Sequence, residues 1–186
     1  WVSFAVICCC VCMSIPIMHL VSLLTDKDFS IECATSVLML LMVCGAFGRI
    51  LGGMLGEYIG ALPGYIIMSL GQTIFVVWFP HLISPATIYI MAALFGFTYS
   101  GVMSSILVCT RMMVSAKYGA RAMSLTSFFG WIGMGVGGFL GGYFFDIYGD
   151  YNWAFTFAGI MGIINLLILS QFWLRIRNVN KELLNT

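Results

Sequence analysis

The stretch GGMLGEYIG at residues 52–60 returns as GGYFFDIYG at residues 141–149. Both copies have the pattern G-G-x-x-x-[D/E]-x-x-G, and they begin 89 residues apart. Each copy closes a long apolar segment, and the second copy comes three segments after the first. If every segment crosses a membrane, the two copies end on opposite sides of it. The pattern therefore predicts two three-helix units of opposite topology. A chance likeness of two glycine-rich helix ends, in a chain with 21 glycines, stays open.

Composition supports a membrane protein. Hydrophobic residues make up 61% of the chain and charged residues 8%, whereas soluble domains carry about 25% charged residues. A bilayer core about 30 Å thick needs roughly 20 apolar residues per helix. We expect an all-α six-helix membrane bundle over residues 1–174, with repeat one at about 1–80, repeat two at about 85–174 and a cytoplasmic tail at 175–186. The expected spans are 2–24, 34–55, 62–80, 85–109, 123–145 and 153–174.

Basic residues predict the orientation, because short loops rich in Lys and Arg stay on the cytoplasmic side. Only Lys27 falls at the end of an odd-numbered span. The other seven lie near or beyond the ends of even-numbered spans: Arg49, Arg111, Lys117, Arg121, Arg175, Arg177 and Lys181. Both ends of the chain are then expected in the cytoplasm.

Several function classes are excluded or disfavoured. The basic residues form no run, so nucleic-acid binding is not expected. The cysteines at positions 8, 9, 10 and 12 lie in an apolar segment without the second pair or nearby His that a zinc site needs. We expect them to pack as small apolar residues, with no metal and no cofactor. An intramembrane enzyme is disfavoured because His19 and His81 both lie near the outer surface and no two acids share a span.

The chain opens at Trp1, directly in hydrophobic sequence. A start inside a membrane helix is typical of a fragment. We therefore expect a preceding N-terminal half as a partner, although a complete six-helix protein stays an alternative.

Glycines recur every three or four residues in two of the spans. Such spacing lets helix backbones approach closely in lipid. The second span carries Gly48, Gly52, Gly56 and Gly60, and the fifth carries Gly130, Gly133, Gly137 and Gly141. These residues predict close packing of the two spans against neighbours.

Residues 48–60 resemble the loop signature of the major facilitator superfamily, in which a glycine-rich helix end precedes an acid and another glycine. Residues 19–26, 93–96 and 145–155 look like the C-terminal half of bacterial monocarboxylate-transporter-like members. The resemblance implies a bacterial cytoplasmic (inner) membrane protein of twelve helices, of which this chain holds the last six. It also implies that the first and fourth spans line a solute cavity, the second and fifth meet the other half, and the third and sixth face lipid.

The fourth span carries a stripe of small and polar residues at helical spacing. In lipid, a polar stripe faces protein or a water-filled path. We expect this stripe to line the cavity, although packing between helices without a solute stays an alternative. Its members are Tyr89, Ala93, Gly96, Ser100, Ser104 and Arg111.

Arg49 is the clearest charge inside a span. A charge at that depth is costly and is by default functional, but Arg49 could also snorkel to the interface or pair with Glu57. The resemblance implies that Arg49 serves an anionic substrate, while Gly45 replaces an Asp that those transporters carry. We further expect Glu57 and Arg111 to form an inner latch, and Asp146 to make a matching outer contact.

Together these patterns predict a secondary transporter that moves a small organic solute by alternating access. A monocarboxylate anion is the candidate solute, and the bilayer is the environment of the whole bundle. A six-helix channel or a structural subunit without transport activity stays the alternative.

Overall fold

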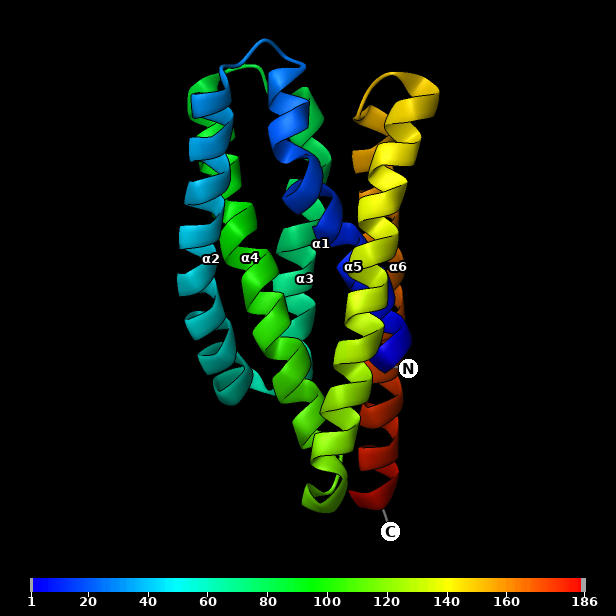
Figure 1. The fold of residues 1–186 in the computed structure, drawn as a ribbon. Helices are drawn as coiled ribbons and strands as arrows, with labels where there is room; N and C mark the ends of the chain where they lie inside the picture. Colours follow the sequence, from blue (N-terminus) through cyan, green and yellow to red (C-terminus); the bar gives the residue numbers. More distant parts are fainter. Residues whose placement is uncertain (1, 185–186) are drawn as a thin grey trace.

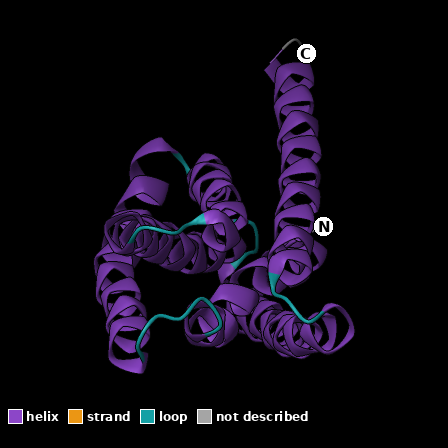
Figure 2. Cartoon of the chain, turned by 90° about the horizontal axis from the view of Figure 1, so that it is seen from above, coloured by secondary structure: helices purple, strands orange, loops and turns teal. Residues whose placement is uncertain are grey.

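The computed structural model describes residues 2–184 and contains six long α-helices (Figure 1). Each helix holds a stretch long and apolar enough to cross a membrane. Viewed from above, the described chain is helix and loop throughout, without a strand (Figure 2). The helices are α1 (Val2–Thr25), α2 (Ile31–Ile59), α3 (Ala61–Trp78), α4 (Pro85–Met112), α5 (Gly119–Tyr148) and α6 (Asn152–Leu184), with short 3-10 turns η1 (Phe79–His81) and η2 (Ala116–Tyr118).

The predicted six-helix membrane fold is confirmed, and most span boundaries fall within four residues of the helix ends. The exception is α6, which continues to Leu184 through the segment expected as a tail. Residues 175–184 contain no Gly or Pro that would end a helix. Loss of hydropathy marks where a span leaves the bilayer, but it does not stop the helix.

Both copies of the glycine motif end at a glycine with positive φ. Gly60, the last residue of the first copy, has φ 98° between α2 and α3. Gly149, the last residue of the second, has φ 70° and donates its N–H to the carbonyl oxygen of Phe145 at 2.8 Å. Positive φ favours glycine because it has no Cβ. The two glycines differ in ψ, which is 146° at Gly60 and 8° at Gly149, so the copies share the requirement for glycine but not one turn geometry.

The two copies also lie at opposite ends of the bundle (Figure 1). The α1–α2, α3–α4 and α5–α6 connections share one end, and the α2–α3 and α4–α5 connections share the other with the end of α6. The even-numbered helices thus end together, on the side where the basic residues of the sequence gather.

The closest helix contacts pair α2 with α4 and α1 with α5 (Figure 1). A methyl group on Gly48 would collide with the backbone of Phe97 in α4. In the other pair, a Cβ on Gly137 would lie 2.8 Å from the carbonyl oxygen of Val11 in α1. Gly48 and Gly137 hold equivalent places in the two repeats, so each repeat packs its second helix against the first helix of the other repeat.

Two further glycines of these seams, Gly52 and Gly141, lie at similarly close contacts. A Cβ on Gly52 would lie 2.5 Å from the Cα of Gly101, and one on Gly141 would overlap the ring of His19. Gly56 has more room, because the nearest atom, Cγ1 of Val108, would lie at 3.7 Å.

Lys27 joins two connections at the end of the bundle opposite the basic cluster. Its Nζ donates hydrogen bonds to the carbonyl oxygens of Pro80 and Leu82, the latter at 2.9 Å. Partial burial lowers the pKa of Lys27 from its usual value. The α1–α2 connection is therefore tied to the turn between α3 and α4.

Candidate functional site

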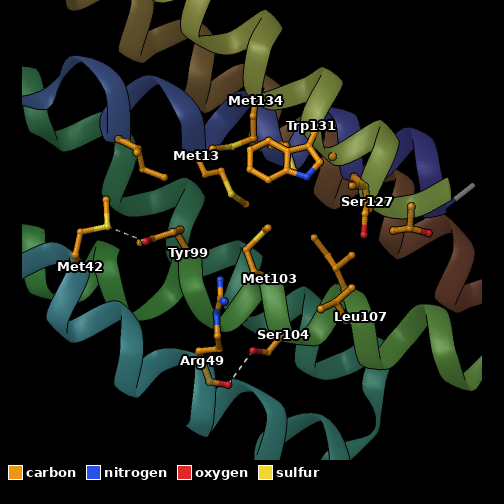
Figure 3. A pocket seen from close by; sticks show the side chains of 16 residues that line it. Met13, Met42, Arg49, Tyr99, Met103, Ser104, Leu107, Ser127, Trp131 and Met134 are labelled. Atoms are coloured by element: carbon orange, nitrogen blue, oxygen red, sulfur yellow. Dashed lines mark hydrogen bonds between the residues drawn. The ribbon is translucent and has the colours of Figure 1, made fainter. Parts of the chain in front are cut away.

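A cavity of about 460 Å³ lies among α1, α2, α4 and α5 (Figure 3). This volume falls in the range of small-molecule sites, about 300–1,000 Å³. Most of the lining is apolar. Its methionines are Met13, Met42, Met103 and Met134, its aromatic residues are Tyr99 and Trp131, and its polar residues are Arg49, Ser104, Thr126 and Ser127.

The helices around the cavity differ in how much of each is buried. In its most apolar stretch, α1 is 67% buried, whereas α2 is 28% and α5 only 17% buried. Large apolar side chains stand exposed on these two helices, including Met39 at 69% and Phe139 at 71%. The outward surfaces of α2 and α5 are thus left uncovered by the other described residues.

Arg49 projects from α2 into the cavity (Figure 3). It is the only charged residue among the described residues that line it. Met42 stands two helical turns earlier on the same face of α2 and also lines the cavity. Gly48 and Gly52 occupy the adjacent face, which packs on α4. Because those glycines set the rotation of α2, the next residue after Gly48 points into the cavity.

The α4 side supports Arg49 through its backbone. The hydroxyl of Ser104 donates to the carbonyl oxygen of Arg49 at 2.8 Å. Five residues earlier in α4, the Tyr99 hydroxyl donates to the sulfur of Met42 at 3.3 Å, and the Tyr99 ring stacks on Phe95. A thioether is a weak acceptor, so the Tyr99 hydroxyl is available for a stronger one.

Comparison with protein families identifies the fold. The sequence model described as Major Facilitator Superfamily matches residues 1–185, almost the whole chain. The chain belongs to the major facilitator superfamily. Members are secondary transporters of small solutes rather than enzymes, and six apolar helices make this one an integral membrane protein. No curated protein matches the chain.

In this facilitator, part of the predicted α4 stripe lines the cavity and part packs against α2. Ser104 lines the cavity, but Tyr89 and Ser100 do not. The Tyr89 hydroxyl bonds that of Ser36 on α2. Ser100 is buried against Gly45 of α2. A Cβ added to Gly45 would lie 3.3 Å from the Cβ of Ser100. The small residues here bring two helices together, which is the alternative that the pattern left open.

The predicted latch residues of the facilitator do not meet one another. Glu57, Arg111 and Asp146 are all exposed at helix ends. Glu57 borders a separate groove with Leu51. Among the described residues there is no ion pair between Glu57 and either Arg49 or Arg111. An Arg49–Glu57 pair, one of the alternatives for Arg49, is therefore not formed.

Most of the cavity lining contributed by α5 was not predicted from the sequence. Ser127, Trp131 and Met134 share one face at i, i+4 and i+7. In a span that is apolar nearly all round, these residues resemble lipid-facing ones. Their spacing shows that they share a face of α5, but it does not show whether that face points to the cavity or to lipid.

A second group of polar side chains lies inside the bundle, between α3 and α6. Asn165 accepts a hydrogen bond from the Tyr65 hydroxyl at 3.2 Å and donates to Ser69 Oγ at 2.6 Å. Gln72 donates to the carbonyl oxygen of Cys9 at 3.3 Å, and its Oε1 has no partner within the described chain. The resemblance implied that α3 and α6 face lipid. Large apolar side chains such as Ile74 and Ile163 are exposed on these helices, while the polar residues are fully buried on their inner faces.

The cysteines near the start of α1 are buried among apolar side chains. Over residues 2–184 no three His, Cys, Asp or Glu side chains gather as a metal site would require. His19 lies in the α1–α5 contact, where Nε2 is 2.9 Å from the carbonyl oxygen of Gly138.

Proposed function

We propose that this transporter carries a small organic anion, with a monocarboxylate as the candidate, and that Arg49 binds its negative group. One observation carries the proposal: Arg49 is the single charged side chain that the described residues place at the cavity. A guanidinium presents parallel N–H donors that match a carboxylate. In an apolar cavity this pairing is stronger than in water.

Alternating access would use the two contacts in which the second helix of one repeat packs on the first helix of the other. The α2–α4 and α1–α5 contacts are built alike, and the glycine-rich helices α2 and α5 run in opposite directions through the bundle. Two such units could exchange conformations and open the cavity to either side. A bound anion would shift the balance between these states only as far as it binds one of them better.

We propose that an N-terminal six-helix half covers the exposed surfaces of α2 and α5 and completes the cavity. Both ends of this chain would lie in the cytoplasm of a bacterial cell, with the bundle in its cytoplasmic membrane. Glu57 and Arg111 at one end, and Asp146 at the other, would then contact that half rather than one another. Their exposure at helix ends supports this role.

Uptake of labelled monocarboxylates by the full-length transporter in membrane vesicles tests the proposal. Arg49→Ala is expected to abolish uptake while the protein still accumulates in the membrane, and Arg49→Lys should retain part of it. Arg121→Ala removes the same charge at an exposed position outside the cavity and serves as the control. Normal uptake by Arg49→Ala would overturn the assignment.

The same vesicles separate a carrier from a channel. A carrier saturates and exchanges labelled for unlabelled solute across the membrane. Flux that rises without saturation and shows no exchange would contradict alternating access.

A further inference from the structure

We infer that the cavity selects monoanions with a bulky apolar body, which Trp131 and the methionines hold while Arg49 holds the charge. This inference rests on the proposed binding of an anion by Arg49. It adds a second subsite, the body subsite, defined as Met13, Met103, Trp131 and Met134.

The two subsites lie on opposite walls of the cavity (Figure 3). Arg49 enters from α2, while Trp131 and Met134 enter from α5 and Met13 from α1. Met103 of α4 stands between the walls. A solute with its negative group at Arg49 therefore extends its other end toward Trp131.

The side chains of the body subsite suit an apolar group of variable shape. Methionine side chains are flexible and polarizable and make favourable contacts with rings. An indole offers a large flat face for stacking. Trp131 is 74% exposed, and none of the described rings stacks on it, so its face is open to a ligand.

The cavity offers little to a solute with many polar groups. The Ser104 hydroxyl already donates to the backbone of Arg49, and the Thr126 hydroxyl accepts from Thr110 at 3.4 Å. Besides Arg49, the hydroxyls of Tyr99 and Ser127 remain for a solute. These are too few for the many hydroxyls of a sugar, and burying hydroxyls without partners is costly. A dianion would meet one positive charge, since no second cation lines the described cavity.

Size also favours a bulky body. A two-carbon acid would fill only a small part of a cavity of about 460 Å³ and leave the body subsite to water. A larger apolar group displaces that water and gains the free energy of burying apolar surface.

The test is a series of carboxylates of increasing body size, transported by the full-length protein in proteoliposomes. Acetate, cyclohexylacetate and phenylacetate carry the same charged group. We expect KM for the two larger acids to be at least about tenfold below that for acetate, the discrimination that extra apolar groups give in a hydrophobic pocket.

Variants assign the preference to the body subsite. Trp131→Ala is expected to raise KM for phenylacetate by about tenfold or more and to leave KM for acetate nearly unchanged. Trp131→Phe should restore most of the preference. Trp153→Ala is the matched control, because Trp153 is a similarly exposed tryptophan of α6 outside the cavity.

The outcomes separate this inference from the proposed function. Equal or better transport of acetate, still dependent on Arg49, overturns the body subsite and leaves the anion site standing. If Arg49→Ala leaves the transport of all three carboxylates unchanged, both the body subsite and the anion site are overturned. If Trp131→Ala fails to accumulate, the KM series of the unmodified protein and of Trp131→Phe decides.

Discussion

The hydroxyl of Ser104 in α4 donates a hydrogen bond of 2.8 Å to the backbone carbonyl oxygen of Arg49 in α2. The bond joins the helix that bears the cavity's cation to its neighbour α4, which also lines the cavity. A shift of α4 along α2 would therefore also move Arg49.

Ser104→Ala should weaken solute binding without abolishing it. Loss of a typical net hydrogen bond costs about 0.5–1.5 kcal/mol, which corresponds to an increase of several-fold in KM for an anionic substrate. Ser124→Ala is the control, because its hydroxyl bonds only within its own helix, to Ala120. An unchanged KM would mean that Arg49 is positioned without this bond.

Gly48→Ala should destabilise the bundle, whereas Gly53→Ala should not. A methyl group on Gly48 meets the backbone of Phe97, which cannot rotate away, and overpacking costs about 1–3 kcal/mol. Gly53 has no described atom within 4 Å of the added Cβ, and alanine in a helix gains about 0.5–1 kcal/mol over glycine. Thermal unfolding in detergent measures both, and equal melting temperatures would contradict close packing at Gly48.

Asn165→Leu should lower stability because it removes one acceptor and one donor from the buried polar group. The Tyr65 hydroxyl would lose its partner, and hydrogen bonds between membrane helices contribute about 0.6–2 kcal/mol. Gln171→Leu, on an exposed face of the same helix, should have little effect. Equal effects of the two variants in the unfolding assay would argue against the network.

Gln72→Met should cost less than Asn165→Leu, although both side chains are fully buried. The substitution gives up a long bond to Cys9 but also removes the unpaired Oε1, whose burial carries a penalty. A larger loss for Gln72→Met in the same assay would show that Oε1 has a partner, such as a buried water.

Lys27→Met should loosen the turn between α3 and α4. Two carbonyl oxygens, those of Pro80 and Leu82, lose their donor. A net bond of about 1 kcal/mol corresponds to about fivefold faster local hydrogen exchange. Exchange at residues 79–84 measures the change, and Lys117→Met at the other end of the bundle should leave that segment as it is.

The fold was predictable because hydropathy reports directly on membrane crossing. The glycine spacing also located the close contacts, since backbone approach has few other causes in lipid. The continuation of α6 beyond its membrane span was not predicted, because apolar content says nothing about helix continuation in water.

The site was predictable only in part. Arg49 stood out because a charge in a span is costly wherever it points. Ser100 and Tyr99 are neighbours in sequence, yet only Tyr99 lines the cavity. Small residues occur both in helix contacts and in cavity linings. Whether the α4 stripe faces α2 or the cavity therefore could not be predicted without the position of α2. Trp131 carried no signal, because an apolar residue in a span costs nothing on any face.

The exchange of helices between the repeats also bears on how the chain is assembled. During synthesis α1 enters the bilayer long before α5, the helix whose glycines receive it, has left the ribosome. The glycine seam of α2 likewise waits for α4. Neither half of the bundle can complete its own packing early, so nascent chains that stop after α3 should remain loose in the membrane and open to quality-control proteases.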